Sequence, residues 1–373
     1  MAKRILITCT DSMMKQFLEP HVVNLVNHGY EVEIACSKVL NRMKEVHEDL
    51  GKLVEIHDLS LQRSPLAILE HVKGYKELKT IIDHGNFDLI WTNEPVMGVV
   101  TRLASQRARK KGTKVLYMVH GFHFYKGAPW VNWLVFYPIE CFMATKADCI
   151  CTINKDDYAM VQKMKVDKTN YIHGVGIDTT RLHDNSKTNI REELGLDRNT
   201  FLVLSIGELN KNKNQKVIIK AIAELKDENI HYILCGKGDQ QSNLEKLSIK
   251  LKIDNRVHFL GYRKDVVDIC SQADVFAMSS KREGLPVASL EAMYCGLPLV
   301  NSNIRGFSDV TENGVSGYVC PPDDVHGFAE GIERIKDNKI LRDRMAENNT
   351  RTVSDFCLSQ TLQEVEKMIG DLA

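Results

Sequence analysis

The sequence has no surplus charge of either sign. Its 49 Lys and Arg residues balance 49 Asp and Glu residues, so the formal net charge at pH 7 is zero. Nucleic-acid-binding domains normally carry a basic surplus, which they use to neutralise phosphates. We therefore expect no nucleic acid among the partners.

Long apolar runs are also missing. A membrane-spanning helix needs about 18 or more apolar residues in a row, and the nearest candidate, residues 130–145, contains Asn132, Pro138 and Glu140. The apolar run at residues 5–7 is brief and passes directly into polar residues, which predicts a strand rather than a secretion signal. The expected location is the cytoplasm, and a peripheral position at the inner face of the cell membrane stays open.

Metal and dinucleotide patterns are absent too. The ten cysteines are scattered through mostly apolar runs, which predicts reduced core thiols. Cys149 and Cys151 form a close pair, but no second pair completes a zinc site. The segment 236–241 (GKGDQQ) lacks the third glycine of a dinucleotide-binding turn. We expect no metal and no other cofactor.

What is present is an alternation of short apolar runs and helix-period segments. This pattern is typical of parallel sheets wrapped by helices, and 373 residues favour two such domains of roughly 150 to 200 residues each. The expected strands are 4–9, 31–36, 53–56, 89–92, 114–119, 149–153, 201–206, 231–235, 257–260, 275–277 and 298–301.

The expected class is therefore α/β, with two Rossmann-like, doubly wound domains that face each other across a cleft. We place the N-terminal, acceptor-side domain at residues 1–185 and the C-terminal, donor-binding domain at 196–355, with a polar linker within 178–199. Residues 356–373 are expected to form a helix that crosses back to the N-terminal domain. In such folds the ligands bind beyond the carboxyl ends of the strands.

The most informative segment follows the expected strand 275–277. Pro286 suits the first position of a helix, so the helix should begin within residues 284–286 and direct free amides at a diphosphate. Glu283 precedes this helix and Glu291 lies two turns inside it, and carboxylates accept hydrogen bonds from paired sugar hydroxyls. Such a glutamate pair can equally be a solvated helix cap.

The segment resembles the retaining glycosyltransferases with the GT-B fold, specifically family 4. Their hallmark is two glutamates separated by seven residues around a Gly-Leu-Pro helix start, which residues 283–293 (EGLPVASLEAM) match. The resemblance implies that Glu283 contacts donor-sugar hydroxyls and that Glu291 contacts the nucleotide ribose. Residues 205–207 (SIG) followed by Lys213 resemble the family's glycine-turn-lysine segment, which implies a diphosphate contact by Lys213. Many relatives carry arginine directly after that glycine, whereas this chain has Glu208.

The family's remaining landmarks imply further site residues. Residues 236–238 and 257–263 resemble the base-binding region, where Tyr262 or Arg263 could pack near the nucleobase or against the following helix. His120 stands where relatives place a histidine near the transferred sugar. The expected catalytic residues are Glu283, His120 and Lys213, and the expected acceptor-side residues are Phe122, His123 and Lys126. The expected donor-binding residues are Gly207, Lys211, Lys213, Gly236, Gly261, Tyr262, Arg263, Glu283, Gly284, Leu285, Pro286, Val287 and Glu291.

The resemblance implies a retaining glycosyltransferase of polysaccharide biosynthesis. Its donor would be a nucleotide-sugar, a UDP-hexose or UDP-N-acetylhexosamine, and its acceptor a glycan or a lipid-linked glycan. The nucleotide-sugar is a substrate, so no cofactor is implied. Two alternatives stay open: a nucleotide-sugar epimerase on a GT-B scaffold, and a non-catalytic nucleotide-sugar-binding subunit. Aromatic side chains recur at helical spacing at Trp130, Trp133, Phe136 and Tyr137. Such a stripe is typical of a packed core or, alternatively, of a face that touches lipid.

Overall fold

The computed structural model describes residues 2–62, 64, 67–182 and 189–373. They form two compact units: Met1–Gly176 with Ser359–Ala373, and Ile177–Leu358. The second unit is therefore inserted into the first. The expected boundary at residue 185 lies outside the described residues. Residues 177–182 belong to the second unit because Ile177 and Leu182 pack in its core with Val353 and Phe356.

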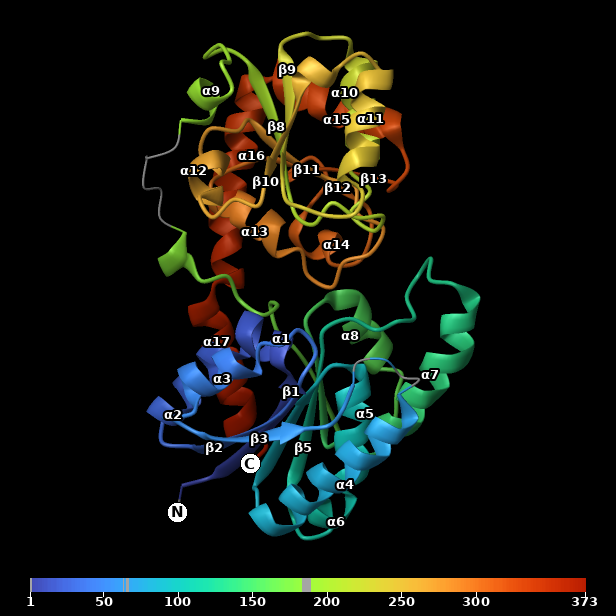
Figure 1. Ribbon diagram of the computed structural model, residues 1–373, viewed down its shortest axis with the longest axis vertical. Helices are drawn as coiled ribbons and strands as arrows, with labels where there is room; N and C mark the ends of the chain where they lie inside the picture. The colour runs from blue at the N-terminus through green and yellow to red at the C-terminus, as the bar shows by residue number, and fades with distance from the viewer. Residues whose placement is uncertain (1, 63, 65–66, 183–188) are drawn as a thin grey trace. The chain divides into compact units, whose positions relative to one another are not determined.

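The first unit contains a seven-stranded parallel sheet in the order β3-β2-β1-β4-β5-β6-β7 (Figure 1). The strands are β1 Arg4–Thr10, β2 Glu31–Ser37, β3 Glu55–Leu59, β4 Leu89–Asn93, β5 Lys114–Val119, β6 Cys149–Thr152 and β7 Lys168–Tyr171. The prediction of a strand at 53–56 was wrong by about two residues, because residues 51–53 form a turn after the preceding helix. The strand β7 was not predicted, since Lys168–Tyr171 is polar and only partly buried.

Helices connect these strands as crossovers. They are α1 Asp11–Met13, a π-helical turn Met14–Leu18, α2 Glu19–Asn27, α3 Met43–Leu50, α4 Ile68–Gly85, α5 Pro95–Ala104, α6 Gln106–Arg109, α7 Trp130–Ala144 and α8 Lys155–Val161. The chain's last helix, α17 Leu358–Gly370, lies almost entirely in this unit, where Val365, Met368 and Ile369 are buried. Glu366 of α17 accepts a hydrogen bond from Asn24 of α2 at 3.2 Å.

The second unit contains a six-stranded parallel sheet in the order β10-β9-β8-β11-β12-β13. Its strands are β8 Phe201–Ile206, β9 Ile230–Cys235, β10 Val257–Gly261, β11 Val275–Met278, β12 Leu299–Ser302 and β13 Gly317–Cys320, the last of which was not predicted. Its helices are α9 Ile190–Glu193, α10 Lys216–Leu225, α11 Gln241–Lys250, α12 Val266–Cys270, α13 Val287–Tyr294, α14 Phe307–Val310, α15 Val325–Asp337 and α16 Lys339–Thr352. Short 3-10 turns occur at Thr179–Arg181, Asp254–Arg256 and Val353–Phe356.

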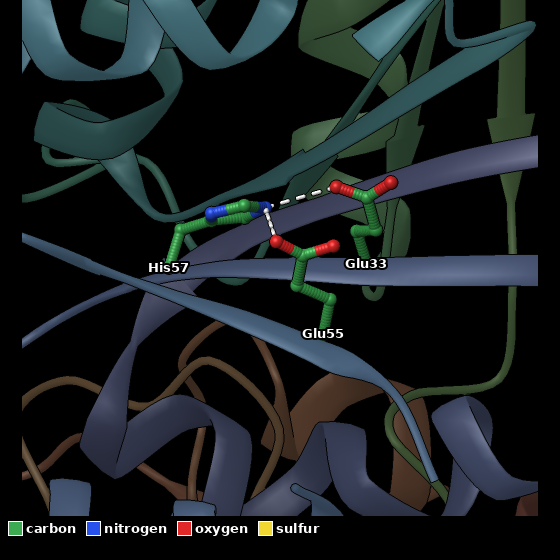
Figure 2. A group of neighbouring side chains, drawn as sticks. All are labelled: Glu33, Glu55 and His57. Atoms are coloured by element: carbon green, nitrogen blue, oxygen red, sulfur yellow. Dashed lines mark hydrogen bonds and ion pairs between the residues drawn. The ribbon is translucent and has the colours of Figure 1, made fainter.

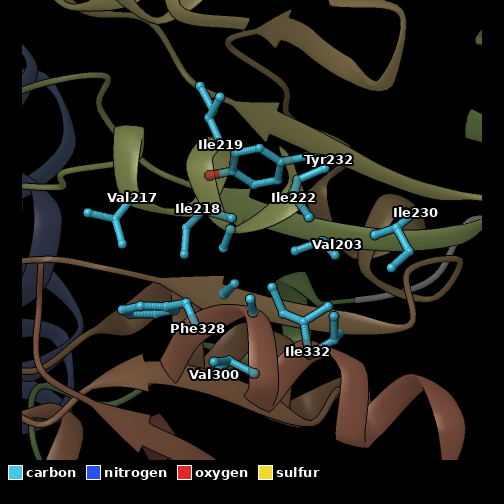
Figure 3. Packing of buried hydrophobic residues seen from close by; sticks show 14 of the residues in the cluster. Val203, Val217, Ile218, Ile219, Ile222, Ile230, Tyr232, Val300, Phe328 and Ile332 are labelled. Atoms are coloured by element: carbon cyan, nitrogen blue, oxygen red, sulfur yellow. The ribbon is translucent and has the colours of Figure 1, made fainter. Parts of the chain in front are cut away.

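The strands β8, β9 and β11 of the second unit are almost entirely buried on both faces, as their apolar runs predict. Successive side chains of a strand point to opposite faces. Val203 accordingly packs under α10 and α15 with Ile218 and Phe328, as Figure 3 shows. Its neighbours Leu202 and Leu204 pack on the other side with α12, α13 and α14. A fully buried side chain of this size contributes about 1.5–3 kcal/mol to folding.

Each sheet has one point where the strand order reverses. In the first unit this point lies between β1 and β4, and in the second it lies between β8 and β11. Loops leaving the two central strands diverge there, which opens a crevice at the carboxyl edge of the sheet. The topology therefore directs attention to the loops after β1, β4 and β5 and to those after β8 and β11.

No helix among the described residues is long and apolar enough to cross a membrane. All ten cysteines are free thiols, and seven of them are buried.

Candidate active site

Three glycines bring the loops after β8, β9 and β10 into close contact. The Gly207 N–H donates to the Cys235 carbonyl at 2.9 Å, and the Gly236 N–H donates to the Gly261 carbonyl at 2.7 Å. A Cβ atom on Gly236 would lie 1.9 Å from the Gly207 carbonyl oxygen. Only glycine permits this approach. The backbones of Gly207, Gly236 and Gly261, all of which were predicted for the site, therefore form one continuous surface.

The loops that follow β8 and β11, on either side of the reversal point, are joined by hydrogen bonds. The Lys281 N–H donates to the Asn212 carbonyl at 2.8 Å, and the Ser279 hydroxyl donates to the Asn214 carbonyl at 2.8 Å. These bonds fix the two loops side by side. They thereby position the side chains that each loop carries.

Lys213 and Glu283 meet across these loops. The Lys213 Nζ lies 2.7 Å from Glu283 Oε1, and the two side chains are only 21% and 12% exposed. The Asn210 side chain orients the lysine, because its Oδ1 accepts from the Lys213 backbone N–H at 2.9 Å. Two residues predicted for the same site, 70 positions apart in the sequence, are thus in direct contact. Asn210 was not predicted, although an Asn-rich loop after a strand is a recognisable turn signal.

Helix α13 begins at Val287, so the prediction of a start within 284–286 was wrong by one residue. Pro286 precedes the helix, because its ψ of 88° is not helical. Gly284 is approached by Gly306 in the loop before α14, where an added Cβ would lie 2.5 Å from the Gly284 carbonyl oxygen. Gly306 has a φ of +82°, a conformation that favours glycine. Its position after β12 could have marked it as a site-shaping residue.

Two predicted residues lie in and beside α13 with their side chains turned toward the protein interior. Leu285 and Val287 pack against the core cluster that contains Phe276 and Leu290. Glu291 is the fifth residue of the helix. Burial raises the pKa of its carboxyl group to about 7, because transfer from water disfavours the charged form.

Glu208 and Lys211 lie on the exposed side of the β8 loop. The Glu208 carboxylate accepts a hydrogen bond from Asn210 Nδ2 at 2.9 Å, and its carbonyl accepts from Gln215 Nε2 at 2.9 Å. At the position where many relatives carry arginine, this chain therefore has Glu208, an exposed carboxylate that helps to hold Asn210.

The side chains of Tyr262 and Arg263 have different surroundings. Arg263 pairs with Asp265 at 2.6 Å and with Glu193 of α9 at 2.8 Å, and these carboxylates raise the pKa of its guanidinium further. Tyr262 is 70% exposed. Of the two, Tyr262 is the side chain that can stack on a base without breaking ion pairs.

In the first unit, polar side chains gather at the ends of β1, β4 and β5. The Thr10 hydroxyl and N–H donate to the Glu94 carboxylate at 3.0 and 2.8 Å. His120 Nε2 lies 2.9 Å from Asn93 Oδ1. Burial lowers the pKa of His120 to about 4, so its imidazole is neutral at physiological pH. The nearby His21 was not predicted, and burial lowers its pKa to about 4 as well.

The predicted acceptor-side residues differ in exposure. Phe122 is buried and stacks on Phe124 with ring centroids 4.6 Å apart. The His123 ring lies 4.9 Å from the Phe136 ring of α7. Lys126 is exposed. Only His123 and Lys126 of this group are therefore available to a polar ligand, and Phe122 offers an apolar wall.

The two tryptophans of α7 have separate roles. Trp133 packs on Phe124 and Tyr137, and its Nε1 donates to the Tyr125 carbonyl at 3.3 Å. Trp130 is 73% exposed. The packed-core interpretation therefore holds for Trp133, as it does for Phe136 and Tyr137 of the same helix. The lipid-facing interpretation of Trp130 stays a prediction.

One group of side chains among the described residues has the composition of a metal site. Figure 2 shows His57 pointing at Glu33 and Glu55, with Nε2 at 2.9 Å from Glu33 and 3.8 Å from Glu55. The Arg4 guanidinium occupies the other Glu33 oxygen at 2.5 Å. The group lies along β2 and β3 rather than at a carboxyl edge, and the arginine already pairs with one of its two carboxylates.

Comparisons with known proteins identify the family of the chain. A family model described as Glycosyl transferases group 1 matches residues 186–352, and one described as Glycosyl transferase 4-like domain matches residues 15–172. The EpsD protein of Bacillus subtilis (strain 168), which carries the name of a glycosyltransferase, is 33% identical over 373 residues. That alignment covers 98% of this chain and 96% of EpsD. The chain belongs to the group 1 glycosyltransferases.

Other relatives of this glycosyltransferase are more distant. An Escherichia coli enzyme named UDP-Gal:alpha-D-GlcNAc-diphosphoundecaprenol alpha-1,3-galactosyltransferase is 26% identical over 318 residues, covering 82% of this chain and 81% of that protein. The structure of Anabaena HepE in complex with UDP has a TM-score of 0.81 at 19% identity and covers 99% of this chain and 100% of HepE. Sucrose-phosphate synthase from Thermosynechococcus elongatus gives 0.80 at 17% identity, covering 99% of each chain. The predicted GT-B fold class is confirmed.

Proposed function

We propose that this glycosyltransferase transfers a hexose or N-acetylhexosamine from UDP, with retention at the anomeric carbon, to a glycan or lipid-linked acceptor. The observation that carries the proposal is the contact between Lys213 and Glu283 beside the reversal point of the second sheet. It supports the proposal because a cation suited to a diphosphate and a carboxylate suited to sugar hydroxyls lie at one place. The E. coli relative's UDP-Gal donor and the UDP in HepE support the choice of nucleotide.

In this proposal the second unit holds the donor. The diphosphate lies against the backbone at Gly207 and the N-terminal amides of α13, where positive charge is concentrated. Lys213 leaves Glu283 for the phosphate and neutralises the charge that develops as UDP departs. Glu283 is then free to accept from sugar hydroxyls, and Glu291 accepts from the ribose. No metal is needed, because the helix amides and the lysine supply the positive charge.

The transfer step keeps the sugar on one face. The bond from the anomeric carbon to the phosphate oxygen breaks, and the acceptor oxygen forms a bond to the same carbon from the same side. The departing phosphate takes the acceptor's proton. His120, which is neutral, donates or accepts a hydrogen bond at the sugar without adding charge.

We further propose that α7 touches the cytoplasmic face of a membrane. Trp130 is exposed there, and Val131 and Leu134 on the same helix are 47% and 66% exposed. An interfacial helix buries such side chains at the headgroup boundary. Replacing Trp130 by Ser while following sedimentation with anionic liposomes tests this: undiminished recovery of the folded variant with the liposomes would remove the membrane contact.

Turnover of labelled UDP-sugars by the purified protein tests the proposed reaction. We expect Glu283→Gln and Lys213→Ala to lower kcat about 10²–10³-fold, and EDTA to leave the rate unchanged. Lys216→Ala is the matched control, because Lys216 is an exposed lysine at the start of α10.

The anomeric configuration of the product, read by NMR, tests retention. Equal rates in all three variants would defeat the site assignment, and UDP binding without transfer would favour the binding-subunit alternative.

A further inference from the structure

The first unit contains a pocket of about 280 Å³ beside the loop that carries His120. Helix α5 contributes one wall, the loop after β5 a second, and α7 the third. Most of the lining is apolar, and the residues used below are Val96, Val99, His123, Phe136 and Ile139.

The acidic side chain in this lining is neutralised by the protein. Glu140 of α7 accepts a hydrogen bond from the Arg102 guanidinium at 2.8 Å, and both side chains are buried. The guanidinium also lies over the Tyr117 ring, 4.0 Å from its centroid. A ligand in the pocket therefore meets aliphatic and aromatic walls. Because Arg102 already neutralises the Glu140 carboxylate, the ligand need not carry a positive charge.

The pocket is continuous with exposed apolar surface on α7. Ile139 lines the pocket and is itself 43% exposed, and its helix neighbours Val135 and Phe142 are 43% and 60% exposed. Apolar patches of this kind mark sites of contact on soluble proteins. The pocket and the face of α7 therefore form one apolar surface.

The unpaired charges on α7 and its flanking residues are positive. Between residues 125 and 147 the charged side chains are Lys126, Lys146 and the paired Glu140. Lys126 is exposed, and the Lys146 ammonium lies over the Phe142 ring, 5.4 Å from its centroid. A cation beyond each end of this apolar helix complements an anionic head group attached to a hydrocarbon.

The polarity of the pocket disfavours an extended peptide. Its backbone N–H and C=O groups would be buried without hydrogen-bond partners against walls that are mostly apolar, which costs free energy for each group. A hydrocarbon chain has no such groups. The occupant that fits the polarity and charge is a single hydrocarbon chain with a phosphate-bearing head.

We infer that this pocket binds the proximal part of the hydrocarbon chain of a lipid-linked acceptor, which makes that lipid part of the substrate. The inference rests on the proposed function. The head group of a chain in the pocket lies at His123, which is three residues from His120 along the same loop. The E. coli relative, whose name includes diphosphoundecaprenol, is consistent with an isoprenoid chain.

Calorimetric titration with farnesyl phosphate, kept below its micelle concentration, tests the inference. We expect farnesyl phosphate to bind the full-length protein at least about tenfold more tightly than isopentenyl phosphate, which has the same head group but little chain to bury. Val99→Trp fills the pocket and should weaken farnesyl phosphate binding about tenfold or more. Val96→Phe is a milder second filling variant. Val23→Trp on α2 is the control, since Val23 is also a partly exposed valine but lies outside the pocket lining.

The outcomes separate the pocket from the proposed reaction. Farnesyl phosphate affinity that is equal in the wild type, Val99→Trp and Val96→Phe, or no binding to the wild type at all, overturns the inference. UDP titration of each variant checks that the second unit is intact, and circular dichroism checks that the first unit folds. Pocket-dependent binding of farnesyl phosphate with no turnover of any UDP-sugar would sink the proposed function while the pocket stands.

Discussion

The two units use the same sheet topology and carry opposite chemistry at the same place. Beside the reversal point of the second sheet, glycine turns and the Lys213–Glu283 ion pair form a charged surface. At the corresponding edge of the first sheet, His120 is neutral and an apolar pocket lies beside its loop. The fold therefore fixes where a site forms, and the loop residues decide whether that site suits a diphosphate or an uncharged, apolar group.

The largest expected effect comes from closing the glycine contact of the second unit. Gly236→Ala puts a Cβ 1.9 Å from the Gly207 carbonyl, so the two loops must separate. We expect a loss of about 1–3 kcal/mol of stability and no measurable UDP binding by calorimetry. Gly370→Ala is the control, because its added Cβ meets only the Tyr30 hydroxyl at 3.8 Å. UDP affinity that survives in Gly236→Ala would show that this backbone surface is not the diphosphate site.

The neutral histidines make the stability of the first unit depend on pH. His21 and His120 have pKa values of about 4 when folded, against an ordinary value near 6.5. Between these values the unfolded chain binds more protons, so stability falls as pH falls from 6.5 to 4, by about 3 kcal/mol per histidine at most. All three tryptophans lie in this unit, so their fluorescence during urea unfolding reports on it.

His120→Gln should remove about half of this dependence, because His21 continues to titrate. A variant with the full wild-type dependence would mean that folding does not lower the pKa of His120.

Glu291 should make UDP binding weaken as pH falls, at a higher pH than the loss of stability. Its pKa is about 7 in the free protein, and only the ionised carboxylate accepts from both ribose hydroxyls. UDP binding should therefore favour deprotonation, and affinity should fall about tenfold from pH 7.5 to pH 6. The phosphate of UDP titrates with both the wild type and Glu291→Gln. The difference between their pH profiles of UDP affinity therefore isolates the contribution of Glu291. Identical pH profiles would exclude Glu291 from the ribose contact.

The smallest expected effect concerns Glu208. Replacing this exposed carboxylate by the arginine common in relatives adds a cation near the diphosphate. An exposed charge contact contributes about 0.2–1 kcal/mol, so Glu208→Arg should tighten UDP binding by up to about fivefold. Glu208→Gln is the control for loss of the negative charge alone. A decrease in affinity in Glu208→Arg would indicate that the carboxylate's bond to Asn210 matters more than its charge.

The sequence predicted strongly apolar elements well and marginal ones poorly. Strands such as Phe201–Ile206 were placed correctly because they are buried on both faces, whereas Lys168–Tyr171 is a partly exposed edge strand without an apolar run. In the site, the sequence could place Lys213 near Glu283, because both residues lie in loops that follow strands at the same edge of the sheet. The position of Gly306 and the ion pairs of Arg263 depend on packing between distant segments, which no local pattern records.

The insertion of one unit into the other has a consequence for biosynthesis. The segment Ile177–Leu358 is contiguous, and the first unit needs Ser359–Ala373 to cover its own surface with Val365, Met368 and Ile369. During translation, the later unit can therefore reach its native state while the earlier one still lacks its final helix. We expect a nascent chain that ends near residue 358 to be protease-resistant in the donor half and susceptible in the half that was synthesised first.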